Sequence, residues 1–277
     1  MRWAFDIARA SIRVLRGHKS LVLFPVFSMV ATVAVVAGAL GVVGLPVTFD
    51  RLYHVHLTEA GWPAVVVVYF VLSFVTIFCN AALVHAANEA VEGRPATVAV
   101  GLRGAWQRIV PILLWSLLSC TISLALRVIG RQFGIIGRIA EGVAEIVWAL
   151  VTYFVVPVMI VEDGSVRDSV KRSRELLRKA WGAEVGGGLG VSAVMFALAA
   201  LGMAVVLVFV LVAAIAGIGL PGLVVATVVL GVWFLVVGTV WSAVSAIYRV
   251  VLHRFASGRP LPASFDDLDL SSALLAR

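Results

Sequence analysis

Residues 185–248 contain no aspartate, glutamate, lysine or arginine, and this uncharged run limits the possible folds more than any other feature. A helix that crosses a membrane needs about 20 apolar residues, because the hydrocarbon core is about 30 Å thick and a helix rises 1.5 Å per residue. The run is therefore long enough for two spans. Residues 217–222, Gly-Ile-Gly-Leu-Pro-Gly, lie near its middle and favour a turn between them.

Other apolar runs in the chain are also long enough to cross a membrane. The predicted spans are residues 21–44, 63–86, 109–129, 141–161, 187–214 and 223–248. Hydrophobic residues make up 62% of the chain and charged residues 13%, against about 25% charged in a soluble domain. Because a soluble fold cannot hide so much apolar surface, lipid is the expected solvent. We predict an all-α polytopic membrane protein with one domain over residues 1–277, an interfacial helix at 1–19 and a cytoplasmic tail at 249–277.

The first apolar run has a second interpretation. Residues 21–36, followed by Ala37-Gly38-Ala39, resemble the core and cleavage site of a secretory signal. Signal cores normally stop after about 7–15 residues. This run continues to Phe49, which favours a span that is retained.

The distribution of lysine and arginine predicts the orientation. The N-terminal segment, the second and fourth loops and the C-terminal tail carry 18 of these residues, and the opposite loops carry 4. The positive-inside rule then places both termini in the cytoplasm. The expected location of the protein is the cell membrane of a bacterium. The net charge of +7 therefore marks the cytoplasmic side, and no nucleic-acid partner is expected.

A repeated plan runs through the chain. Each cytoplasmic segment before an odd-numbered span has the pattern of an amphipathic interfacial helix, and Gly93-Arg94-Pro95 recurs as Gly258-Arg259-Pro260. The sequence thus predicts three membrane hairpins, each preceded by an in-plane helix. In the third copy Ser165 and Asp168 form a capping-box pattern, and Arg167, Lys171, Arg174 and Arg178 are basic residues along one flank of the helix. This basic face binds anionic lipid or a protein partner, or it only anchors the hairpin at the interface.

The layout resembles a group of prokaryotic six-span membrane proteins that form a family of unknown function. More distantly, it is similar to the membrane domain attached to some bacterial glycerophosphodiester phosphodiesterases. The residues that carry the resemblance are Asn80-Ala81-Ala82-Leu83, Glu92-Gly93-Arg94-Pro95, Pro157, Glu162-Asp163, Arg172-Ser173, Trp181 and Pro262-Ala263-Ser264-Phe265-Asp266. The resemblance implies no established activity, and no phosphodiesterase catalytic domain is present.

Polar residues inside the third and fourth spans predict a binding cavity. A hairpin that turns at Gly134 brings Arg127 level with Glu141 and lets hydroxyl groups face each other at matched depth. The candidate site residues are Arg127, Glu141, Glu145, Ser116, Ser123 and Thr152, together with Asn80 on the second span. Either the charged pair locks the hairpin, or it forms the floor of a site for a substrate, ion or proton. Glu145, the deeper carboxylate, is the best single candidate.

No metal or cofactor is expected. His85, Glu89 and Glu92 share one helix face, but one histidine with two glutamates lacks the ligand set of known zinc motifs. His54 and His56 have no further ligand near them in the sequence. Gly182, Gly186 and Gly190 are spaced by four residues, which favours close helix packing within the chain or in a homo-oligomer.

The preferred function is a non-enzymatic membrane component that binds anionic lipids or a protein partner. A small-molecule or ion transporter with a polar site between the third and fourth spans is the first alternative. An intramembrane lipid-modifying enzyme is the second, although no histidine or aspartate lies deep in a predicted span to carry catalysis.

Overall fold

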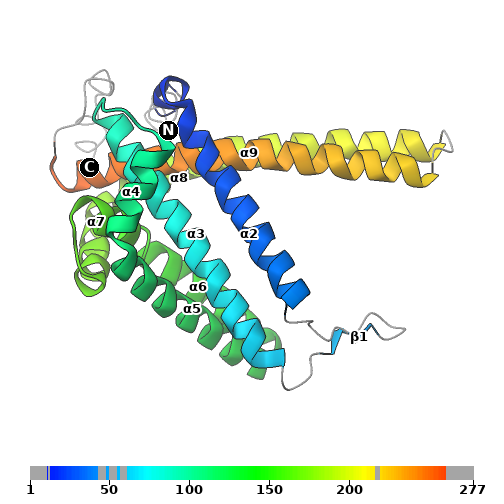
Figure 1. Cartoon of the computed structure of the whole chain (residues 1–277), viewed down its shortest axis with the longest axis horizontal. Coiled ribbons are helices and arrows are strands. Elements are labelled where there is room, and N and C mark those ends of the chain that lie inside the picture. The colour runs from blue at the N-terminus through cyan, green and yellow to red at the C-terminus, as the bar shows by residue number, and fades with distance from the viewer. Residues whose placement is uncertain are drawn as a thin grey trace. The chain divides into compact units, whose positions relative to one another are not determined.

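A computed structural model describes residues 11, 13–42, 48–49, 55–56, 61–215 and 219–259 (Figure 1). Its elements are η1 (Lys19–Val22), α2 (Leu23–Val42), β1 (Thr48–Phe49), β2 (Val55–His56), α3 (Gly61–Val91), α4 (Val98–Gln107), α5 (Ile109–Gln132), α6 (Gly134–Val151), α7 (Val155–Val161), α8 (Val166–Ile215) and α9 (Gly219–Ala256). Most of the predicted interfacial helix 1–19, His54 and the tail from residue 260 lie outside the described residues. Trp181, Gly182, Gly186 and Gly190 belong to α8, but their packing also lies outside what the structure describes.

The described part of the chain is helical, as the sequence predicts. Five of its helical stretches are long and apolar enough to cross a membrane: Ser20–Ala39, Pro63–Val91, Ile109–Gln132, Ile136–Val161 and Val224–Ala256. Each overlaps one of the predicted spans. The remaining predicted span, 187–214, lies inside α8, where Ala199–Val210 is a shorter apolar stretch. The count of six spans stays a prediction.

A small strand pair lies between α2 and α3. β1 and β2 pair antiparallel, with Thr48 opposite His56 and Phe49 opposite Val55. The sequence analysis predicted no strand in this segment. With two residues in each strand, the pair is far shorter than strands that form an independent sheet.

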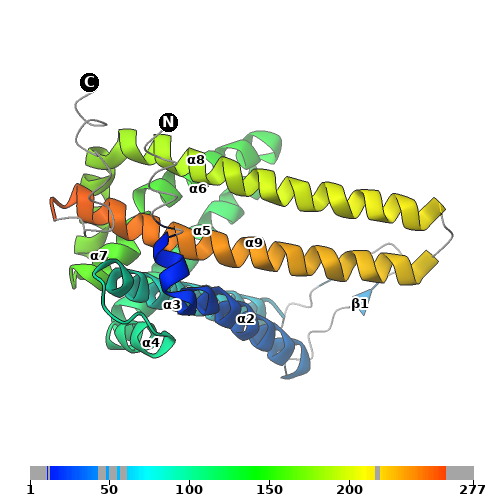
Figure 2. The same ribbon diagram turned by 90° about the horizontal axis from the view of Figure 1, so that it is seen from above.

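The described residues group into two compact units. One contains the described residues of Met1–Pro25, Ala87–Ala96 and Arg178–Arg277, and the other contains Val26–Ala86 and Thr97–Leu177. In the first unit α8 and α9 lie side by side (Figure 2), and the Trp233 indole packs directly against the backbone of Gly202. The single domain over residues 1–277 stays a prediction.

The second unit is built around the α5–α6 pair. Phe133 alone separates the two helices, and Gly134 follows with a φ of 59°, so the chain turns at the predicted glycine. Two contacts show that the helices run antiparallel: Gly130 contacts Glu141 near the turn, and Trp115 stacks on Trp148 further from it. The two tryptophan rings are 5.9 Å apart between centroids and inclined by 23°.

Two predicted elements differ in detail from the observed helices. The predicted span 141–161 lies within the apolar stretch Ile136–Val161, but α6 ends at Val151 and α7 begins at Val155, so the helix is interrupted there. The predicted in-plane helix at Val166 and the span 187–214 are instead one continuous helix, α8, of 50 residues. Nothing in the α8 sequence stops a helix between the two predicted parts, since its glycines weaken a helix without the steric block that proline imposes.

Candidate functional site

The charged pair predicted between α5 and α6 does not form. Arg127 is exposed, and its guanidinium lies over the Tyr69 ring of α3, 5.7 Å from the ring centroid. Glu141 is half-buried against Gly130, and Glu145 is exposed. Among the described residues no ion pair joins Arg127 to either glutamate. Arg127 precedes Gly130 by three residues and so lies about 60° around the helix from the contact with α6.

The hydroxyl groups of the predicted cavity bond to their own helices. Ser116 Oγ donates to the Ile112 carbonyl at 2.8 Å, and Thr152 Oγ1 donates to the Trp148 carbonyl at 2.7 Å. Ser123 and Asn80 are half-buried. Instead of a polar cavity, the helix pair has an open groove of about 550 Å³, lined by the apolar residues Ile122, Leu126, Ala140, Val143, Ala144, Val147, Trp148 and Val151. The hydroxyl groups of Ser116 and Thr152 are thus bonded within their own helices, and the groove beside them is apolar.

A broken helix replaces the expected fourth span. α6 ends at Val151, residues 152–154 form a turn, and α7 continues with six of its seven residues buried. Pro157 contributes to the break, because proline has no N–H for the helix ladder and its ring clashes with the preceding turn. A break in an apolar region frees backbone groups that other groups must bond.

Ser173 of α8 bonds both sides of this break. Its hydroxyl donates to the Val151 carbonyl at 2.6 Å and accepts the Phe154 N–H at 3.1 Å. The serine side chain is fully buried. Sequence analysis noted Ser173 only as part of a family resemblance. Its relation to the break has no local sequence signal, because 19 residues separate Phe154 from Ser173.

The beginning of α8 carries the predicted basic face. Ser165 Oγ accepts the Asp168 N–H at 3.2 Å and donates to the Asp168 carboxylate at 2.6 Å, so the predicted capping interaction is present. The four basic side chains Arg167, Lys171, Arg174 and Arg178 are all exposed. Their spacing of four, three and four residues aligns them along one helix face. Buried Ser169, Ser173, Leu176 and Leu177 occupy the other side.

The two Gly-Arg-Pro segments end their helices in the same way. Gly93 and Gly258 have φ angles of 73° and 70°, which favour glycine. Arg94 N–H bonds the Glu89 carbonyl at 2.9 Å, and Arg259 N–H bonds the Arg254 carbonyl at 2.9 Å. The N–H groups of Gly93 and Gly258 bond the carbonyl groups of Ala90 and Phe255, three residues earlier. The C-terminal ends of α3 and α9 are therefore both Schellman motifs.

The end of α7 has a similar conformation. Asp163, which follows Glu162, has a φ of 57°. Asp163 pairs with Arg108, and the Arg172 guanidinium lies 3.4 Å from the Glu162 carboxylate. Glu162 therefore has the same place before a positive-φ residue that Glu92 has before Gly93. This recurrence agrees with the repeated plan seen in the sequence.

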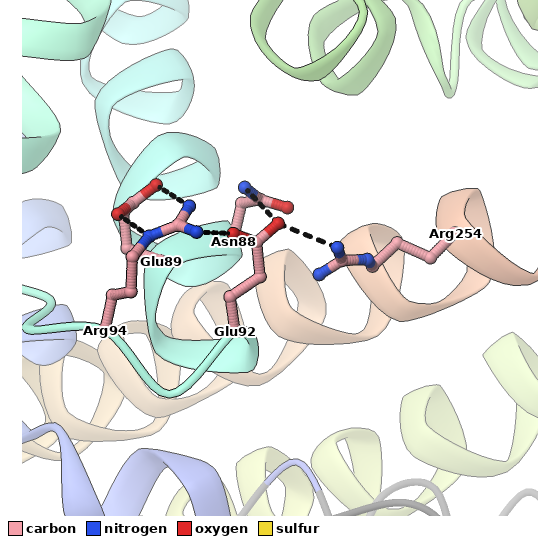
Figure 3. A network of polar contacts seen from close by, with 5 residues as sticks. All are labelled: Asn88, Glu89, Glu92, Arg94 and Arg254. Carbon is pink, nitrogen blue, oxygen red and sulfur yellow. Dashed lines mark hydrogen bonds and ion pairs between the residues drawn. The ribbon is translucent and has the colours of Figure 1, made fainter. Parts of the chain in front are cut away.

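A charged cluster lies where α3 ends beside α9 (Figure 3). Arg94 donates from Nε and Nη2 to the two carboxylate oxygens of Glu89 at 2.6 Å each, and it also pairs with Glu92. The hydrogen bond to Glu89, the largest influence, raises the pKa of Arg94. Glu92 Oε1 also accepts Arg254 Nη2 at 2.7 Å and Asn88 Nδ2 at 3.4 Å.

His85 does not join the glutamates in a metal site. Its imidazole ring packs against Gly104 of α4, whereas Glu89 and Glu92 bond arginines. Helix periodicity correctly placed the three residues near one another along α3. Gly104 and Arg254, the partners of His85 and Glu92, come from other segments, which periodicity does not reveal.

A model described as a family of unknown function, DUF6159, matches residues 60–260. The chain belongs to the DUF6159 family. The range matched by DUF6159 includes the α6–α7 break, the basic face of α8 and the charged cluster at Arg254. No curated protein and no solved structure matches the chain. The distant similarity to the membrane domain of glycerophosphodiester phosphodiesterases stays a prediction.

Proposed function

We propose that this DUF6159 protein is a non-enzymatic component of the bacterial cell membrane that binds anionic lipid through the basic face of α8. In this proposal the chain crosses the membrane six times as three hairpins, with both termini in the cytoplasm. The observation that carries the proposal is the exposed row of Arg167, Lys171, Arg174 and Arg178.

The surfaces of the long helices support a membrane location. Large apolar side chains are exposed along α2, α5 and α9, including Val33 at 59%, Leu114 at 53% and Val228 at 59% of full exposure. Apolar surface on this scale is stable in lipid and costly in water.

The length of α8 supports a position for its basic face at the cytoplasmic surface. A helix of 50 residues is about 75 Å long, more than twice the thickness of the hydrocarbon core. Its first part carries the charges, and its later part belongs to the uncharged run that begins at residue 185. The charged part therefore lies outside the hydrocarbon, where each basic residue gains about 1 kcal/mol near anionic lipid.

Neutralisation of the basic face tests this function. We expect the variant Arg167→Gln/Lys171→Gln/Arg174→Gln/Arg178→Gln to lose about tenfold of its preference for anionic over zwitterionic lipid, and the preference of the wild type to fall with salt. The measurement is the lipid retained by protein purified from nanodiscs of equal phosphatidylglycerol and phosphatidylethanolamine content. Arg131→Gln/Arg138→Gln is the control, because both arginines are exposed near the α5–α6 turn, on the predicted outer side.

An unchanged lipid preference in the fourfold variant would contradict lipid binding by α8. A protein that copurifies with the wild type and is lost from the same variant would instead assign the basic face to a protein partner. If the wild type has the mass of two or more copies and the fourfold variant has the mass of one, the basic face is the interface of a homo-oligomer.

Ion-coupled transport is the second candidate, and the position of Glu145 favours it. Glu145 is an exposed carboxylate within the apolar stretch Ile136–Val161. An ionisable group inside a membrane span often belongs to an ion or proton pathway. If the protein transports protons, Glu145→Gln should abolish proton flux in proteoliposomes that contain a pH-sensitive dye. Glu141→Gln, at the packed contact with Gly130, is the control, and wild-type protein without flux would refute transport.

A further inference from the structure

Arg254 has buried hydrogen-bond donors that no described residue accepts. Its Nη2 donates to Glu92, but Nε and Nη1 are buried and without a partner in the described part of the chain. The Oδ1 atom of Asn88 is a buried acceptor without a partner in the same part. Both side chains meet at Glu92 Oε1, at 2.7 Å from Arg254 and 3.4 Å from Asn88 (Figure 3). The unfilled donors and the unfilled acceptor therefore belong to one small region.

The neighbouring carboxylates do not fill these positions. Arg94 binds both Glu89 and Glu92, and the formal charges of Glu89, Glu92, Arg94 and Arg254 cancel. A buried polar group without a partner costs about 1–3 kcal/mol, and more when it is charged. Such a group in a native structure calls for a further partner, such as a water, an ion or a ligand. Beyond Glu92, the described part of the chain offers no acceptor for Nε and Nη1 of Arg254.

The chemistry of the open positions indicates a phosphate group. Guanidinium N–H groups bind phosphate oxygens through short charge-assisted hydrogen bonds. Asn88 Oδ1 needs a donor, which a hydroxyl or ammonium group attached to the phosphate supplies. The side chains of Arg254 and Glu92 are 12% and 21% exposed, so the edge of the cluster reaches the surface while the Nε and Nη1 donors are buried behind it.

The position along the helices agrees with this chemistry. α3 and α9 both end at the cluster, each two residues before its glycine, Gly93 or Gly258. In the proposed topology these are the cytoplasmic ends of the second and sixth spans. Lipid phosphates and soluble phosphates both reach this depth.

We propose that Arg254 and Asn88 bind a phosphate group that carries a hydrogen-bond donor, at the cytoplasmic ends of α3 and α9. The group belongs to a lipid headgroup or to a soluble phosphate compound. This site is separate from the basic face of α8, because it holds a single ligand through buried donors. Its placement at the headgroup level rests on the proposed topology.

Arg254→Lys is the decisive variant, because it keeps a positive charge for Glu92 and removes the Nε and Nη1 donors. We expect the wild type to retain one phosphate-containing ligand, and the variant to bind it at least tenfold more weakly. Asn88→Leu, of similar size, should weaken it as well. Arg259→Lys is the matched control, since Arg259 is exposed at the same helix end. Thermal unfolding of each variant separates lost binding from lost folding.

Native mass spectrometry supplies the measurement with two probes. Protein released from phosphatidylethanolamine and phosphatidylglycerol nanodiscs tests the lipid source, and titration with inorganic phosphate in detergent tests the soluble source. A ligand seen with either probe and lost in a folded Arg254→Lys variant supports the site. Absence of a ligand with both probes, or equal binding by the variant, overturns it. The α8 variant should leave this ligand bound, so the two lipid proposals succeed or fail separately.

Discussion

Replacement of Ser173 by alanine is expected to lower the free energy of unfolding by about 2–4 kcal/mol, because both hydrogen bonds across the α6–α7 break are lost. The affected groups lie in buried surroundings, where water cannot readily replace the hydroxyl. The measurement is thermal or denaturant unfolding in a fixed detergent. Hydrogen exchange at residues 154–158 should rise at the same time, since the start of α7 loses its anchor.

Ser169→Ala is the matched control for this prediction. Ser169 is also fully buried on α8, four residues before Ser173, but its hydroxyl has no partner in the described part of the chain. Its removal should therefore change stability by less than about 1 kcal/mol. Equal losses for the two serines would mean that the hydroxyl bonds of Ser173 do not stabilise the break.

Replacement of Gly202 by valine is expected to destabilise the α8–α9 pair by about 1–3 kcal/mol. A Cβ atom at Gly202 would collide with the Trp233 indole, so the helices must separate or the ring must move. Unfolding in detergent measures the loss. Gly231→Val on α9 is the control, because a Cβ atom there meets no other atom.

A double variant distinguishes this collision from a general effect of valine. Trp233→Ala removes the ring, so Gly202→Val should cost less in that background than in the wild type. The difference between the two costs is the coupling energy of the pair. Equal costs would contradict direct packing of the indole on Gly202.

Much of the fold follows from local sequence. The length of an apolar run fixes whether a helix can cross the membrane, which is why five of the predicted spans match apolar helices in the structure. Helix ends are also local, since Ser165 bonds Asp168 three residues away and Gly93 ends α3 through bonds within six residues. The continuity of α8 was not expected, because the sequence was divided where charged residues give way to apolar ones, and such a change does not interrupt a helix.

The ion pair predicted between Arg127 and Glu141 is absent from the described residues for a geometric reason. Periodicity places Arg127 and Glu141 on polar faces of their helices, but it does not fix how each helix is rotated toward its neighbour. In the structure the Glu141 side chain packs against Gly130, and the Arg127 guanidinium lies over the Tyr69 ring. Arg127 lies about 60° around α5 from Gly130, so it points away from the contact with Glu141.

The sequence by itself determined the helical class, the apolar spans and the basic face of α8, because each depends on residues within a few positions of one another. Only the tertiary structure decided which buried polar groups meet. Ser173 reaches the α6–α7 break from another helix, and Arg254 reaches Glu92 across 162 positions of sequence. Such contacts depend on how helices pack, and packing is set by the shapes of many side chains together.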